Sequence, residues 1–129
     1  MKGLPIDTRY SVGSYFTRSE FACKCGKCDF DTVDHTLVGI LEILRFELDA
    51  PIIITSGCRC PEYNKKVGGS PKSMHLFGQA VDIRCPDVST ETLHKMCTEL
   101  FEHWGGVGFY PNQGFVHIDV RKTKARWKS

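Results

Sequence analysis

Long apolar runs are missing from this sequence of 129 residues, and their absence limits what the chain can be. No stretch approaches the roughly 20 consecutive apolar residues that a membrane-spanning helix needs. Residues 1–19 are polar and are interrupted by Pro5 and Gly13, so they lack the apolar segment of a secretory signal peptide. We therefore expect a protein that is made in the cytoplasm, has no membrane partner and reaches any external target after release or delivery.

A strong excess of charge of one sign is also missing. Charged residues make up 25% of the chain and the formal net charge is +2, which are ordinary values for a globular protein. This balance gives no indication of a nucleic-acid partner. Only residues 121–129 are locally basic, and we expect them to form a solvated tail that Trp127 anchors. The alternative for this tail is a contact with an anionic polymer.

The chain is too short for two hydrophobic cores. With 129 residues, of which 41% are hydrophobic, it can form one compact unit. We predict a single monomeric domain over residues 1–129, in which residues 1–14 form an irregular arm and residues 121–129 form the basic tail.

Cysteine, in contrast, is abundant. The seven cysteines are an odd number, which excludes a complete set of internal disulfide bonds. In a reducing cytoplasm, clustered thiols more often bind metal than pair with each other. Cys85 and Cys97 lie in apolar surroundings along the chain, and we expect both in the core.

Three of the cysteines are close together and suit a metal ion. Cys23, Cys25 and Cys28 lie around a glycine that lets the backbone curl, so that their sulfur atoms can converge. With Cys60, or with Cys58, they would supply four sulfurs to a tetrahedral structural zinc ion. A disulfide bond to Cys60 that forms after export, and plain free thiols, are the alternatives.

Two segments have the period of amphipathic helices. The first begins at Asp31 or Thr32 as its cap and continues to about Leu48, with apolar residues three or four apart. The second begins after Ser89 and continues to about His103, before a glycine that ends it. We expect the first helix to be scaffold without a catalytic role.

Three segments have the character of strands. Residues 52–55 are a β-branched run typical of a buried strand. Residues 80–83 and 115–121 alternate between apolar side chains and others, which indicates strands with one buried face. The second of these alternating segments is predicted to form a hairpin with the glycine-rich segment before it, through a turn at residues 111–114.

Histidine and aspartate in two of these segments suit a catalytic metal ion. His75 and Asp82 flank a turn at Gly78, and His117 lies on the polar face of the last predicted strand. Two imidazoles and one carboxylate leave a fourth position for water or substrate, as a catalytic zinc site requires. We interpret His75, Asp82 and His117 as three ligands of one zinc ion.

These residues resemble the D-alanyl-D-alanine carboxypeptidase family of zinc metallopeptidases, whose fold is shared with the Hedgehog signalling domain. The SxHxxGxAxD pattern of that family is matched by Ser73, His75, Gly78, Ala80 and Asp82. Residues 53–59 are similar to the family's strand ending in Ser-Gly-x-Arg, and residues 106–119 are similar to its final hairpin. The resemblance extends from about residue 15 to residue 127, and the ending of the chain, through Arg126 and Trp127, also resembles the branch that includes phage lysis enzymes and small bacterial murein hydrolases.

The resemblance implies an α+β fold in which helices flank a small central antiparallel sheet, as in the Hedgehog and D-Ala-D-Ala carboxypeptidase structures. It implies a zinc-dependent peptidase that hydrolyses stem-peptide or cross-link bonds of peptidoglycan, as a carboxypeptidase or an endopeptidase. It further implies a phage or prophage enzyme that lyses the cell wall. The alternative is a non-catalytic module on the same fold, which has kept the zinc for binding or structure.

The resemblance also suggests roles beside the metal ion. Arg59 matches the family's arginine, whose guanidinium would hold the oxyanion or a substrate carboxylate. Ser73 would hydrogen-bond the substrate or brace its loop. Better-known members carry the general base at the positions that Gly114 and Phe115 occupy here, so Asp119 is the available carboxylate. Asp119 would serve as the base or orient an imidazole N–H.

Overall fold

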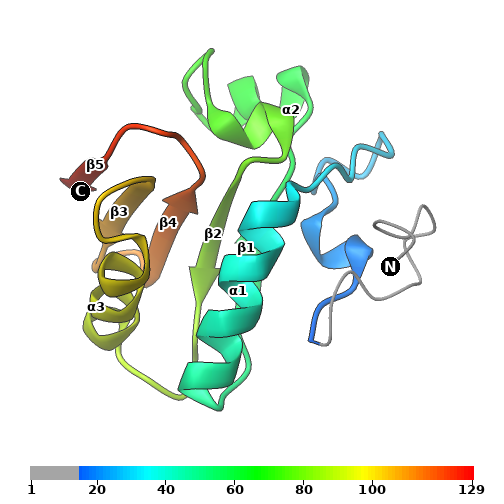
Figure 1. Cartoon of the computed structure of the whole chain (residues 1–129). Coiled ribbons are helices and arrows are strands. Elements are labelled where there is room, and N and C mark those ends of the chain that lie inside the picture. The colour runs from blue at the N-terminus through cyan, green and yellow to red at the C-terminus, as the bar shows by residue number, and fades with distance from the viewer. Residues whose placement is uncertain (1–14) are drawn as a thin grey trace.

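A computed structural model of this chain describes residues 15–129, and the arm predicted over residues 1–14 lies outside the described residues. Helices and strands are interspersed up to α3, and three successive strands end the chain; Figure 1 shows their arrangement. The helices are η1 (Arg18–Phe21), α1 (His35–Leu48), α2 (Pro61–Lys66), η2 (Met74–Phe77) and α3 (Thr90–Phe101), where η marks a 3-10 helix. The strands are β1 (Ile53–Ser56), β2 (Ala80–Arg84), β3 (Gly106–Tyr110), β4 (Phe115–Asp119) and β5 (Ala125–Lys128).

The five strands form one sheet in the order β1-β2-β4-β3-β5. Every neighbouring pair is antiparallel except β3 and β5, which are parallel. The predicted α+β class is therefore confirmed, with a sheet that is mostly antiparallel. The predicted hairpin is also confirmed, since β3 and β4 pair across the turn at residues 111–114.

The core fills the space between one face of the sheet and the helices α1 and α3. Figure 1 shows these two helices side by side in front of the strands. Cys85 and Cys97 are buried in this core, as predicted. Its largest fully buried side chains include Leu37, Leu41, Leu44, Leu93, Phe101, Val81, Ile83, Val107, Val116 and Ile118. Because this face of the sheet is covered, the polar residues that alternate with Val81, Ile83, Val116 and Ile118 lie on the opposite face.

Helix α1 begins later than predicted. Its N-cap is Asp34, whose carboxylate accepts hydrogen bonds from the backbone N–H groups of Thr36 and Leu37. The predicted caps Asp31 and Thr32 are wrong, although both residue types suit the position. A carboxylate must reach the N–H groups two and three residues on, and only Asp34 does so here.

Helix α3 follows Ser89, the predicted cap, but ends at Phe101 instead of near His103. Glu102 takes a positive φ of 42° there, and the chain then turns toward Gly105, which also has a positive φ. The sequence pattern placed the end at the glycine because glycine adopts this conformation without steric cost.

The tail predicted over residues 121–129 is anchored by Trp127 and exposed at residues 122–124 and 128–129, as expected, but residues 125–128 form an edge strand of the sheet, which the prediction missed. Strand β5 pairs in parallel with β3, and the guanidinium of Arg126 donates hydrogen bonds to the carbonyls of Gly105 and Trp104. Strand β3 would otherwise present unpaired backbone groups at the edge of the sheet. Residues 125–128 alternate between apolar and basic side chains, but four residues next to further basic residues are too short a pattern to distinguish a strand from a tail.

None of the helices in the described part of the chain has both the length and the apolar character that crossing a membrane would require.

Candidate metal centre

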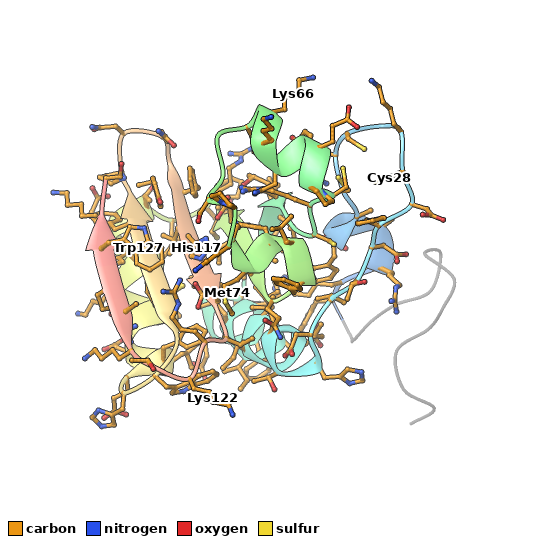
Figure 2. All side chains as sticks on the ribbon, turned by 90° about the horizontal axis from the view of Figure 1, so that it is seen from above. Cys28, Lys66, Met74, His117, Lys122 and Trp127 are labelled. Atoms are coloured by element: carbon orange, nitrogen blue, oxygen red, sulfur yellow. The ribbon has the colours of Figure 1, made fainter. Side chains whose placement is uncertain are left out.

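One row of residues crosses the sheet and carries the candidate site. Asp82 of β2 pairs with His117 of β4, His117 pairs with Gly108 of β3, and Gly108 pairs with Trp127 of β5. Residues directly opposite each other on neighbouring strands project from the same face. Asp82, His117 and Trp127 therefore share the face that the helices leave open, and Figure 2 shows His117 and Trp127 next to each other.

His75 reaches this row from the short helix η2. Ser73 caps that helix, and its hydroxyl accepts a hydrogen bond from the His75 backbone N–H at 3.2 Å. Gly78 ends the helix with a φ of +67°, a conformation that few other residues adopt. The sharp turn at Gly78 lets one short segment supply both His75 and Asp82, the second of which is already on β2.

The three predicted ligands meet at one point. The Nε2 atom of His75 lies 3.3 Å from Oδ1 of Asp82, and the Nδ1 atom of His117 lies 3.0 Å from the same oxygen. A tetrahedral zinc ion with bonds of about 2.0–2.2 Å holds its ligand atoms roughly 3.3 Å apart. The spacing therefore fits a zinc ion, and among the residues that the structure describes this group has these three donors and no fourth.

Each imidazole is held so that one nitrogen faces the centre. The Nδ1 atom of His75 lies 2.8 Å from the carbonyl oxygen of Gly57, to which an Nδ1–H can donate, so Nε2 keeps its lone pair. The Nε2 atom of His117 lies 2.8 Å from Oδ2 of Asp119, which leaves Nδ1 of His117 for the centre. Oxygen acceptors behind both histidines are the usual arrangement around metal-bound imidazoles.

Asp119 lies behind His117, away from the cleft. Its side chain is fully buried, and its carboxylate also accepts hydrogen bonds from the Gly106 N–H at 3.1 Å and from Nε and Nη2 of Arg121 at 2.8 Å. A side chain at Gly106 would collide with this carboxylate. Of the two roles predicted for Asp119, this geometry favours the orientation of His117.

Charge around the centre shifts three pKa values. Burial alone would raise the pKa of Asp82, but hydrogen bonds with His117 and His75 hold it well below its ordinary value. At Asp119 burial again raises the pKa, but hydrogen bonds with His117 and Arg121 outweigh it and hold the pKa below its ordinary value. At His117 burial lowers the pKa, but Asp119 and Asp82 outweigh it and raise the pKa. Both carboxylates are therefore ionised at neutral pH, and a proton on His117 competes with any cation at the centre.

Arg59 lies on the other side of Asp82. Its Nη2 atom is 3.3 Å from Oδ2 of Asp82, its Nε donates to the Ser56 hydroxyl at 3.1 Å, and its Nη1 donates to the Asn64 side chain at 3.1 Å. Asn64 is almost completely buried, and Gly69 leaves room where Asn64 and Arg59 meet. The guanidinium is thus fixed from three sides and borders the centre, as its predicted role requires.

A cleft with a volume of about 540 Å³ opens over the centre. Ser73 and Arg59 border it together with the three candidate ligands. Its remaining wall includes Met74, Lys72, Tyr110, Gln113, Phe115, Arg121 and Trp127. Among the described residues that border this cleft, Asp82 is the only carboxylate, and it is already a candidate metal ligand. No second carboxylate among these residues is available as a general base.

The aromatic part of the cleft wall was missed from the sequence. The rings of Tyr110 and Phe115 stack with centroids 4.4 Å apart, and the Trp127 indole N–H donates to the Tyr110 hydroxyl at 2.9 Å. The Trp127 ring also lies 5.1 Å from the ring of His117. Strand alternation placed Phe115 on the face of His117, but only the pairing of β5 with β3 brings Trp127 there.

Comparisons with known proteins give matches over much of the chain. The sequence model of the peptidase M15 family matches residues 14–119. The peptidoglycan L,D-endopeptidase MepK of Escherichia coli is 34% identical over 75 residues, which cover 54% of this chain and 40% of that protein. The probable peptidoglycan L,D-endopeptidase MepK of Haemophilus influenzae is 33% identical over 61 residues, which cover 47% of this chain and 31% of that protein. The matched region thus spans two fifths or less of the length of these relatives.

Proposed function

This chain belongs to the peptidase M15 family, and we propose that it is a zinc-dependent peptidase that cleaves the peptide part of peptidoglycan. The observation that carries the proposal is the meeting of His75, His117 and Asp82 at the floor of a cleft, with one nitrogen of each histidine turned toward the carboxylate. The relatives named as peptidoglycan L,D-endopeptidases support the substrate class.

The donor set suits zinc. Two imidazole nitrogens and one carboxylate oxygen are typical ligands of catalytic zinc sites. The candidate ligands are Nε2 of His75, Nδ1 of His117 and the carboxylate of Asp82. Zinc bound there would polarise the scissile carbonyl and lower the pKa of the attacking water. This chemistry requires both imidazoles to be neutral, and the acceptors at Gly57 and Asp119 fix the required tautomers.

Arg59 and Asp119 have different tasks in this proposal. Arg59 borders the cleft, and its guanidinium stabilises the oxyanion that forms during hydrolysis or holds a carboxylate of the substrate. Asp119 acts as a positioning residue, since its carboxylate already accepts hydrogen bonds from His117, Arg121 and Gly106. Ser73 braces the loop of His75 through the hydrogen bond to that residue's backbone.

The charge of the cleft suits stem peptides. Arg59, Lys72 and Arg121 border it, and Asp82 is its one acidic side chain within the described residues. Stem peptides are short and carry free carboxylates, which these cations attract. The aromatic wall of Tyr110 and Trp127 offers apolar contact to the aliphatic parts of such a peptide.

Endopeptidase action is favoured over carboxypeptidase action, because the relatives carry that name. We further propose a monomeric phage or prophage lysis enzyme that is made in the cytoplasm and meets the wall after release or delivery. The family match does not favour the non-catalytic module.

Digestion of purified murein sacculi tests the proposal. The chain purified with zinc is expected to release soluble muropeptides, and release should stop with chelator and return with added zinc. His117→Ala should be inactive, whereas the matched control His103→Ala should keep the activity, since His103 is exposed and contacts only Glu102 among the described ion pairs. Intact sacculi under all conditions would overturn the proposal in favour of a binding module.

A further inference from the structure

A second group of metal-ligating side chains lies outside the cleft. The sulfur atoms of Cys23, Cys25, Cys28 and Cys60 all lie within 4.8 Å of one another, and those of Cys25 and Cys28 are 3.4 Å apart. Four thiolates around one zinc ion, with bonds of about 2.3 Å, are roughly 3.8 Å apart. We call these four residues the cysteine cluster. Cys58 is not part of it, so Cys60 is the partner of the two that the sequence allowed.

Disulfide bonds do not explain this arrangement. All seven cysteines are free thiols in the structure. Two disulfide bonds would join four cysteines in pairs, and nothing would then require each sulfur to be close to all three others. Convergence of four sulfurs on one point is instead the geometry of tetrahedral coordination, and a set of four thiolates is a usual ligand set of structural zinc.

Backbone N–H groups are aimed at three of the sulfurs. The N–H of Lys27 lies 3.2 Å from Sγ of Cys25, that of Cys60 lies 3.4 Å from Sγ of Cys23, and that of Tyr63 lies 3.4 Å from Sγ of Cys60. Hydrogen bonds of this kind stabilise sulfur that carries negative charge. They are expected where thiolates bind a metal ion, and they have less value around neutral thiols.

Three lysines and one glutamate, Glu62, are the charged side chains that border a hollow beside the cysteine cluster, so positive charge predominates there. Lys24, Lys27 and Lys66 border this hollow of about 420 Å³, which Cys25, Cys28 and Cys60 also border. Figure 2 shows Cys28 and Lys66 at the same side of the molecule, away from Trp127. Four thiolates and one zinc ion have a net charge of −2, which nearby lysines partly neutralise. The charge of the surroundings is therefore complementary to a loaded site.

We propose that Cys23, Cys25, Cys28 and Cys60 bind a structural zinc ion. Four protein ligands close the coordination sphere, so this ion has no position for a substrate. It ties residues 23–28 to the start of α2, where Cys60 follows Arg59 directly in the chain. The cysteine cluster thereby helps to hold the segment that aims Arg59 at Asp82. This site shares no ligand with the proposed catalytic centre.

Metal analysis of the whole chain tests the proposal. Protein purified under reducing conditions without chelator is expected to hold two zinc ions, and His117→Ala is expected to keep one. That retained ion should remain in Cys58→Ala combined with His117→Ala, since Cys58 lies next to the cysteine cluster but outside it. It should be lost from Cys25→Ser combined with His117→Ala. No zinc in His117→Ala would overturn the proposal.

A measurement on the unaltered chain avoids variants that fail to fold. After exchange of zinc for cobalt, four thiolates give strong thiolate-to-cobalt charge-transfer absorption in the near ultraviolet, which a centre of two imidazoles and one carboxylate lacks. A cobalt-loaded chain without this absorption would overturn the proposal. The peptidase proposal can fail independently: one zinc ion, kept in His117→Ala and accompanied by intact sacculi, supports the cysteine cluster and rejects the catalytic centre.

Discussion

The proposed catalytic centre and the cysteine cluster meet at two consecutive residues, since Arg59 contacts Asp82 and Cys60 belongs to the cluster, but the fold prepares the two sites differently. In the catalytic centre, Asp82 and His117 are paired neighbours on two central strands, so the hydrogen bonds of the sheet hold them together. In the cysteine cluster, Cys23, Cys25 and Cys28 lie in a segment without helix or strand. Strand pairing by itself places Asp82 beside His117, whereas we expect the proposed zinc ion to order the cysteine cluster.

Because of this difference, we expect the two zinc ions to contribute differently, one to catalysis and the other to stability. A centre built on rigid strands presents its ligands before the ion arrives, which suits catalysis because the geometry costs little to assemble. At a site built on a loop, the free energy of metal binding is largely free energy of folding. We therefore expect loss of the first ion to abolish activity and loss of the second to lower stability.

The largest expected effect is on hydrolysis in His75→Ala. This change removes one of three ligands, so muropeptide release should become undetectable while one zinc ion per chain remains. The free energy of unfolding, measured with denaturant, should fall by less in His75→Ala than in Cys28→Ser, because we expect the sheet to form without the ion. Full zinc occupancy with normal hydrolysis in His75→Ala would remove this residue from the centre and end the comparison.

Cys28→Ser should show the opposite pattern. Cys28 is exposed, so its replacement removes a ligand without opening a cavity in the core. We expect a loss in the free energy of unfolding on the order of 3 kcal/mol, because metal binding is coupled to folding at such sites. The folded variant should still release muropeptides. Cys58→Ala is the control, and it should keep both zinc ions. Equal stability of Cys28→Ser and the unaltered chain would contradict a structural role.

Asp119→Asn sharpens the account of the catalytic centre. An amide can still face His117 but is a weaker acceptor, and loss of such a partner lowers metal affinity or activity by about 10-fold to 100-fold. Zinc affinity, measured by competition with a chelator, should therefore fall together with the rate. If the rate falls by more than about 100-fold while zinc affinity is unchanged, Asp119 is the general base instead.

The smallest effect concerns acid stability. The folded pKa of Asp119 lies below its ordinary value, so the stability that its ionisation contributes is present above the unfolded pKa of about 4 and is lost as the pH falls below it. The difference in free energy of unfolding between the unaltered chain and Asp119→Asn should therefore become smaller as the pH falls below about 4. A difference that stays constant from neutral to acid pH would show that the Asp119 pKa is not depressed.

The two sites also differ in how far the sequence could predict them. His75, Asp82 and His117 were found because their spacing and strand alternation are local properties, and the structure places them together as expected. The choice between Cys60 and Cys58 needed coordinates. Cys58 directly precedes Arg59 and Cys60 directly follows it. Only the path of the chain into α2 decides which of the two sulfurs turns toward Cys25.

The surroundings of Arg59 and the cleft wall could not be predicted. Asn64 looks like any polar residue of a short helix, yet it is buried and fixes the guanidinium of Arg59. Trp127 reaches the cleft only through a parallel pairing with β3, and no local pattern marks that pairing. Packing between distant segments decides both positions.

Gly108 determines the shape of the cleft although it contributes no side chain to it. It lies between His117 and Trp127 in the row across the sheet, and an added Cβ there would collide with the indole. Because Gly108 has only a hydrogen atom as its side chain, the Trp127 indole packs directly on the backbone of β3, beside the His117 imidazole. Any bulkier residue would push the indole outward and change the width available to a substrate. Gly108 is therefore the position at which a substitution would alter substrate selectivity without changing a metal ligand.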